Sequence, residues 1–129
     1  MNIISHSLGV SISRKVIKGG SATDHSAGAY TVGESLQGKV KNFIGIAGVN
    51  YGVMQCLPAA VLSYCNRVDG LFPGATSVSS PSTFLSTLNN QGGTEGKKVY
   101  TVWSKSDELI LNSCVVWGKV TSRISGQMD

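Results

Sequence analysis

Residues 3–9 read Ile-Ile-Ser-His-Ser-Leu-Gly, and this stretch is the strongest indication of the fold. Short apolar residues run into Ser-x-Ser-x-Gly, and a helical pattern follows at once. This order is typical of a strand, a sharp turn and a helix, the layout called a nucleophile elbow, which presents a serine hydroxyl, here that of Ser7, at the end of a strand. Small flanking residues suit such a turn, and Ser5 and Gly9 are both small. An ordinary strand-to-helix loop is the alternative interpretation, because such pentapeptides are common.

Composition narrows the class of protein. The chain has 129 residues, 41% hydrophobic residues and 14% charged residues, which suits one globular domain. The formal net charge is +4, but the basic residues are scattered, so we expect no nucleic-acid partner. No apolar run reaches transmembrane length, and no signal-peptide pattern follows Met1.

The helix after Ser7 is expected over residues 7–18, with Leu8, Ile12 and Val16 on one face. Gly19-Gly20 then predicts its end. Residues 21–38 are polar and rich in glycine, which favours a surface loop. The apolar run 40–48 predicts a strand buried on both faces, and its Gly45 and Gly48 suggest close backbone approach.

The second half of the chain also combines helix and strand patterns with loops. Residues 49–80 are expected to form a long irregular insertion, and loops of that length are typically a functional lid or binding rim, or else disordered. Ser80 and Pro81 predict the start of a helix with an apolar face of Phe84, Leu85 and Leu88. Residues 98–103 alternate as a strand, 104–108 form a polar turn, 109–117 are apolar, and 121–129 form a loop. The fold class is therefore α/β, with parallel strands and flanking helices.

Three cysteines are present. Cys56 and Cys65 lie nine residues apart in a loop-rich stretch, which favours a disulfide typical of a secreted protein, with two reduced thiols as the alternative. Cys114 would then be a buried free thiol or would pair outside the chain. No Cys-x-x-Cys or histidine pair suggests a metal site, and no cofactor motif is present.

A serine nucleophile needs a base and an orienting acid, which occur in the order Ser, acid, His in hydrolases with a nucleophile elbow. Asp107 follows the strand 98–103 and is the candidate acid, with Glu108 as competitor and a turn residue as the alternative. The backbone N–H of Leu8 would supply half of an oxyanion hole. Only His6 and His25 exist. We expect His6 to point away from the hydroxyl and His25 to be a solvated loop residue.

Aromatic side chains offer one further possibility for this site. Tyr51 and Phe72 could line an acyl pocket, although simple packing is the alternative.

Several segments resemble the class 2 lipases, secreted α/β-hydrolases that cleave triacylglycerols. The resemblance rests on the residues Ile-Ile-Ser-His-Ser-Leu-Gly-Val-Ser-Ile-Ser-Arg-Lys-Val-Ile-Lys-Gly-Gly (3–20), Phe-Ile-Gly-Ile-Ala-Gly-Val-Asn-Tyr-Gly (43–52), Cys-Asn-Arg-Val-Asp-Gly (65–70), Ser-Thr-Phe-Leu-Ser-Thr-Leu-Asn (82–89), Val-Tyr-Thr-Val-Trp-Ser-Lys-Ser-Asp-Glu (99–108) and Val-Trp-Gly-Lys-Val-Thr-Ser-Arg-Ile (116–124). It implies that Ser7 is the nucleophile, Asp107 the acid and Leu8 the oxyanion donor.

The resemblance also implies that residues 1–129 are the central part of such a domain, a partial α/β-hydrolase fold. The family's first strands would precede Met1, and its histidine would lie beyond Asp129. Two functions then remain open. The first is hydrolysis of lipid esters at an interface, in a secreted protein. The second is a non-catalytic secreted remnant or lipid-binding pseudoenzyme. The sequence does not indicate an oligomeric state.

Overall fold

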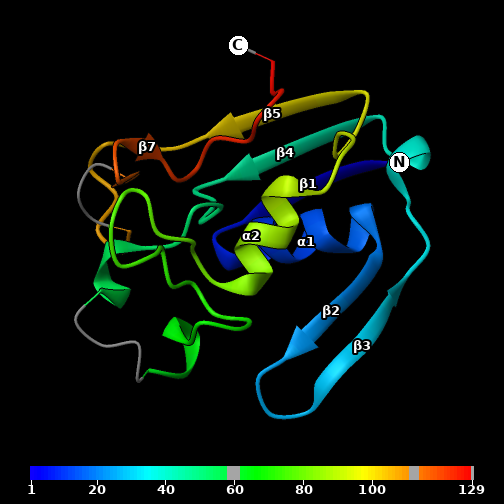
Figure 1. Cartoon of the computed structure of the whole chain (residues 1–129). Helices are drawn as coiled ribbons and strands as arrows, with labels where there is room; N and C mark the ends of the chain where they lie inside the picture. Colours follow the sequence, from blue (N-terminus) through cyan, green and yellow to red (C-terminus); the bar gives the residue numbers. More distant parts are fainter. Residues whose placement is uncertain (58–61, 111–113, 129) are drawn as a thin grey trace.

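The computed structural model describes residues 1–57, 62–110 and 114–128. Its first half contains the strands and helix β1 (Asn2–His6), α1 (Leu8–Lys18), β2 (Gly20–Asp24), β3 (Gly28–Gly33) and β4 (Asn42–Ile46). Its second half contains α2 (Thr83–Asn90), β5 (Lys98–Val102), β6 (Val115–Val116) and β7 (Lys119–Val120). Short 3₁₀ turns occupy Gln37–Lys39, Met54–Cys56 and Ser63–Cys65. Figure 1 shows the arrangement.

A parallel sheet of three strands, in the order β1-β4-β5, is the centre of the fold. The register places Ile4 beside Ile44, and Ile44 beside Tyr100. The predicted strands at residues 40–48 and 98–103 are therefore confirmed, and so is the mixed α/β class. The expected burial of the strand at 40–48 on both faces is wrong, because Phe43 is buried on one face whereas Ile44 and Ile46 on the other are only half-buried. Because the strands are parallel, their carboxyl ends lie at one edge of the sheet, where Ser7 follows β1.

One face of the sheet packs against α1. Val10 and Ile17 of the helix meet Phe43 of β4 and Val99 of β5, and all four side chains are buried. The expected close approach at Gly45 and Gly48 is confirmed, because a Cβ at either position would meet Val10 Cγ1 at 3.0 and 2.9 Å. The alternate strand positions point to the opposite face, where Ile4, Tyr100 and Val102 are exposed.

The apolar face expected for α1 is present but lies outward. Leu8, Ile12 and Val16 are 40%, 50% and 47% exposed, whereas the inward face carries Arg14 at 2% and Lys18 at 6%. The inward charges are buried because polar groups from distant segments meet them. Arg14 Nε lies 2.8 Å from Glu95 Oε1, and Arg14 Nη1 donates to the side-chain oxygens of Asn50 and Asn89. Burial lowers the pKa of Lys18, and the Glu95 carboxylate opposes that shift.

The surface loop expected over residues 21–38 is wrong, because an antiparallel hairpin of β2 and β3 occupies most of it. Its turn is formed by Asp24, whose Oδ1 accepts the backbone N–H groups of Ser26 and Ala27 at 2.7 Å each. Gly28 follows with φ +83°, a conformation that favours glycine. Such Asp turns and the Tyr-Thr-Val run after Gly28 were the available sequence signals.

The second helix starts later than expected. Ser82, not Ser80, caps α2: its Oγ accepts the N–H of Leu85 at 3.3 Å and donates to the Gly70 carbonyl at 2.7 Å. Leu85 and Leu88 are buried as expected. Part of the irregular insertion (58–61) and part of the apolar segment 109–117 (111–113) lie outside the described residues. Within the described residues, no helix has the length and apolar character needed to cross a membrane.

Candidate active site

The turn between β1 and α1 has the geometry of a nucleophile elbow. Ser7 has φ 54° and ψ −130°, a conformation that L residues rarely adopt. Its N–H donates to the Ile46 carbonyl at 2.9 Å, and its carbonyl accepts the Val10 N–H at 3.0 Å. These bonds tie the turn to β4 on one side and to the first turn of α1 on the other. A strained residue held in this way is common at functional sites.

Leu8 is the first residue of α1. Backbone N–H groups in the first turn of a helix have no intrahelical acceptor, so the Leu8 amide can in principle donate to an oxyanion. The expected crowding at Gly9 is not found, because a Cβ there would meet no atom within 4 Å. Ser5, on the other flank, is buried and its Oγ donates to Ser13 Oγ at 2.8 Å. Small residues are therefore required by close packing at Ser5, Gly45 and Gly48, whereas Gly9 has space for a side chain.

Ser7 opens onto a pocket of about 160 Å³. Its wall comes from four separate segments and is mainly apolar. The residues that line it with Ser7 are Val49, Val53, Gln55, Tyr64, Leu71, Leu109 and Ile110. An apolar pocket beside a serine hydroxyl can accept a hydrocarbon chain.

Gln55 is a polar exception in this wall. Its amide Nε2 donates to the Leu109 carbonyl, whereas its Oε1 is buried and has no partner in the part of the chain that the structure describes. Buried polar atoms are usually hydrogen-bonded, so this acceptor is notable. No pattern in the sequence singled out Gln55, because its position beside Ser7 depends on the tertiary fold.

Asp107 lies five residues after the end of β5. Its Oδ1 accepts the N–H groups of Leu109 and Ile110 at 2.9 and 2.8 Å, so it forms the turn that the alternative interpretation expected. The turn bonds do not use Oδ2. Asp107 itself does not line the Ser7 pocket, but the two residues whose amides it holds do. The structure thus brings the Asp107 turn, though not its carboxylate, to the serine.

The two histidines lie elsewhere. His6 is exposed at the end of β1, directly before Ser7. His25 lies in the turn between β2 and β3 and pairs with Asp69. Among the described residues, which include both histidines, no hydrogen bond joins Ser7 Oγ to an imidazole.

A model of the lipase (class 2) family matches residues 1–129, the whole chain. The chain belongs to the class 2 lipase family. No curated protein and no solved structure matches it. Within this lipase family the expected chemistry is ester hydrolysis on lipid substrates.

A disulfide joins Cys56 and Cys65 in this member of the family, with the sulfur atoms 2.01 Å apart. Both cysteines are buried in the same apolar cluster as Val53 and Leu71. The bond therefore links two segments that line the Ser7 pocket. Cys114 is free and buried, and its thiol donates to the Ser104 carbonyl at 3.2 Å.

Tyr51 and Phe72 do not line the pocket beside Ser7. Tyr51 lies under the Lys119 ammonium, 5.3 Å from the ring centre, and Phe72 is buried beneath the Arg67 guanidinium at 4.6 Å. The packing alternative therefore describes both residues better than a role in an acyl pocket.

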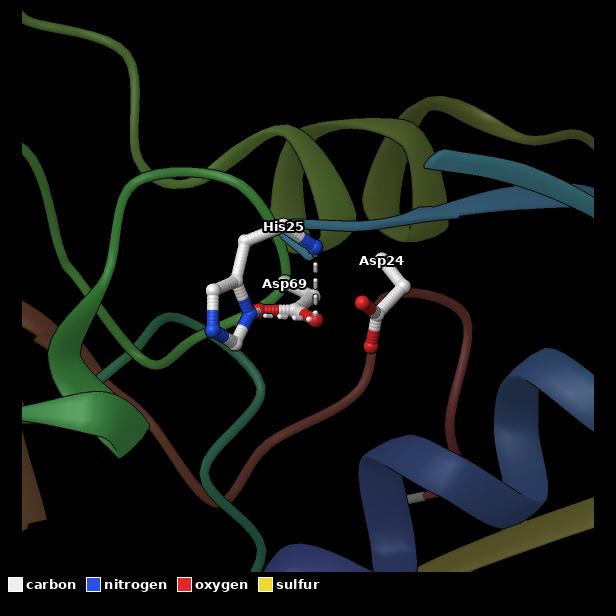
Figure 2. A group of neighbouring side chains, drawn as sticks. All are labelled: Asp24, His25 and Asp69. Atoms are coloured by element: carbon white, nitrogen blue, oxygen red, sulfur yellow. Dashed lines mark hydrogen bonds and ion pairs between the residues drawn. The ribbon is translucent and has the colours of Figure 1, made fainter. Parts of the chain in front are cut away.

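His25 is exposed, as expected, but it is not simply solvated. Its Nδ1 lies 2.9 and 3.1 Å from the two carboxylate oxygens of Asp69, and its backbone N–H donates to Asp69 Oδ2 at 3.2 Å. Figure 2 shows this pair with Asp24 beside it. The hydrogen bond of the imidazole to the Asp69 carboxylate and the negative charge of Asp69 raise the pKa of His25. Nothing in the sequence pointed to Asp69, which lies 44 residues away from His25.

Proposed function

We propose that this chain is a carboxylic-ester hydrolase of lipid catabolism that uses Ser7 as its nucleophile. The observation that carries the proposal is the backbone of Ser7, a residue at φ 54° between a parallel strand and a helix. Strain of this kind costs of order 1–3 kcal/mol and persists where the surrounding structure demands it. The family match and the apolar pocket beside Ser7 support lipid esters as substrates.

The proposed reaction proceeds in two stages. Ser7 Oγ bonds to the ester carbonyl carbon while a base takes its proton, and the carbonyl oxygen becomes an oxyanion that the Leu8 N–H stabilises. The oxyanion collapses, the C–O bond to the alcohol breaks, and the alcohol leaves with the proton. Water then attacks the acyl-enzyme and releases the fatty acid, which restores Ser7.

Asp107 is proposed as the acid that orients the base. Its support is its place after β5 at the carboxyl edge of the sheet, together with the turn that it forms beside the pocket. The proposal assigns the base to neither His6 nor His25, since neither imidazole is hydrogen-bonded to Ser7. It treats residues 1–129 as part of a class 2 lipase domain. An extracellular location is proposed with it, because disulfides persist in oxidising compartments.

The missing contact between Ser7 and an imidazole favours a second candidate function, a non-catalytic lipid-binding protein. In other serine hydrolases, removal of a triad member lowers the rate by about 10⁴–10⁶. A chain without the base would keep the pocket and bind lipid without turning it over.

A long-chain alkyl fluorophosphonate separates the two candidates. The hydrolase proposal expects slow, stoichiometric labelling of Ser7, detected by peptide mass spectrometry, and no labelling in Ser7→Ala. Ser11→Ala is the matched control, because Ser11 is fully buried in α1 and has no part in the proposal. Absence of any adduct, with binding to triacylglycerol emulsions retained, would favour the second candidate.

A further inference from the structure

A cluster of three metal-ligating side chains lies outside the Ser7 pocket. Asp24 and His25 come from the end of β2 and the turn after it, and Asp69 comes from a loop far along the chain. Each offers one ligand atom, and these atoms all lie within 4.8 Å of one another (Figure 2). None of the three lines the Ser7 pocket, so this cluster is independent of the proposed hydrolysis.

Hydrogen bonds hold both carboxylates in place. Asp24 Oδ1 accepts the backbone N–H groups of Ser26 and Ala27 in its own turn, which fixes the carboxylate. Oδ2 takes no part in these two hydrogen bonds. Asp69 is fixed by Asn66, whose Nδ2 donates to Asp69 Oδ1 at 2.6 Å and whose Oδ1 accepts the Asp69 N–H at 2.9 Å. Ligands on two braced segments need little reorganisation to receive an ion.

The charges also call for a cation. The Asp69 carboxylate contacts the His25 imidazole directly, and an Asp24 carboxylate oxygen lies within 4.8 Å of both ligand atoms, so positive charge at this point is attracted by two carboxylates. A protonated imidazole supplies one positive charge, and a divalent ion supplies two. Partial burial of Asp69 opposes ionisation, yet hydrogen bonds from His25 and Asn66 keep the pKa of its carboxyl below the ordinary value. The carboxylate is therefore available as a ligand at neutral pH.

We propose that Asp24, His25 and Asp69 form a binding site for a divalent transition-metal ion of the Zn²⁺ type. Nδ1 of His25 and one oxygen from each carboxylate are the three protein ligands, and water completes the coordination. Binding releases the Nδ1 proton and replaces the hydrogen bond to Asp69 with two metal–ligand bonds. An imidazole ligand suits Zn²⁺, Ni²⁺ or Cu²⁺, whereas Ca²⁺ and Mg²⁺ prefer oxygen ligands alone.

The ion would serve as a clamp. It would join the β2–β3 turn to the loop whose neighbours Tyr64 and Leu71 line the Ser7 pocket. Leu71 is itself bonded to that loop and to Val53, since its N–H donates to the Tyr64 carbonyl and its carbonyl accepts the Val53 N–H. Metal binding would therefore stabilise the wall of the pocket without contacting Ser7.

Calorimetric titration of the whole chain with Zn²⁺ tests the site. We expect one ion per chain and a loss of affinity of at least about tenfold in His25→Ala and in Asp69→Asn. Asp24→Asn keeps an oxygen that can accept the two turn amides but removes the charge, so it is expected to weaken binding while the hairpin stays folded. His6→Ala and Glu34→Gln remove an exposed histidine and an exposed carboxylate elsewhere, and should bind Zn²⁺ like the parent chain.

Thermal unfolding provides a second readout. Saturating Zn²⁺ should raise the Tm of the parent chain and of His6→Ala, because binding to the folded state alone stabilises it, and should leave the Tm of His25→Ala unchanged. Any of three results would overturn the proposal: no Zn²⁺ binding, equal binding by the parent chain and His25→Ala, or Ca²⁺ binding as tight as Zn²⁺.

Discussion

The N–H of Ser7 donates to the carbonyl of Ile46 at 2.9 Å, and this bond continues the parallel pairing of β1 and β4 by one residue beyond β1. The chain must then reverse into α1 at once, which places Ser7 at φ 54°. The position of the serine at the edge of the sheet and the strain in its backbone therefore have the same origin.

If Ser7 is strained, glycine should relieve it. Ser7→Gly is expected to raise the free energy of unfolding by about 1 kcal/mol, because glycine reaches positive φ without a Cβ clash and this gain exceeds its added unfolded-state entropy. Ser7→Ala keeps the Cβ and is the matched control. Urea unfolding monitored by circular dichroism measures both. Equal stabilities of the two variants would show that the turn is not strained at residue 7.

The contact between α1 and the segment that follows β4 leaves no room for a side chain at Gly48. A Cβ at this position would lie 2.9 Å from both Val10 Cγ1 and Asn50 Nδ2. Gly48→Ala is therefore expected to lower the free energy of unfolding by about 1–3 kcal/mol through overpacking. Gly9→Ala, where a Cβ meets nothing within 4 Å, should be neutral or stabilising by up to about 1 kcal/mol in the helix. A smaller effect at Gly48 than at Gly9 in the same unfolding assay would contradict this packing.

The buried ion pair of Arg14 and Glu95 supports α1. Glu95 is 1% exposed and is the carboxylate that faces Arg14 at 2.8 Å and Lys18 at 3.6 Å. Glu95→Gln leaves both cations buried without a negative partner, so the free energy of unfolding is expected to fall by about 3–5 kcal/mol. The exposed Glu34→Gln should change stability by no more than about 0.5 kcal/mol. Equilibrium unfolding of both variants gives the comparison, and similar losses would rule out the buried pair as a main support of the helix.

Cys114 should be slow to react. Burial, with a further contribution from the Asp107 charge, raises the pKa of its thiol above the ordinary value of 9.0. The folded state therefore holds the proton more tightly than the unfolded state, and stability should fall as the pH rises above about 9. Modification of the native chain by iodoacetamide at pH 7.5 should be far slower than in urea, and Asp107→Asn should accelerate it. Equal rates in native and unfolded protein would contradict the buried, electrostatically protected thiol.

The sequence predicted secondary structure correctly where the side-chain pattern of a segment is regular. The strand that became β4 was recognisable from its apolar run, and β5 from its alternation of outward and inward side chains. The strand, turn and helix around Ser7 were recognisable from the order of the residues. The hairpin of β2 and β3 was missed because most of its side chains are exposed, so neither strand has a regular apolar pattern.

The inward face of α1 could not be predicted, because its partners Asn50, Asn89 and Glu95 lie far along the chain. Arg14 and Lys18 look like surface residues until those partners are brought to them by the fold. The same holds for the two candidate sites. The Ser7 pocket takes its wall from separate loops, and the pairing of His25 with Asp69 depends on where the hairpin meets the loop at 66–70.

The central claim, that Ser7 is an acyl-accepting nucleophile, is tested most directly by intact-mass spectrometry of the chain after incubation with a p-nitrophenyl acyl ester. The account predicts a mass increase of one acyl group, located on Ser7 by peptide mapping and absent from Ser7→Ala. An unmodified chain, or an adduct of the same yield in Ser7→Ala, would contradict it.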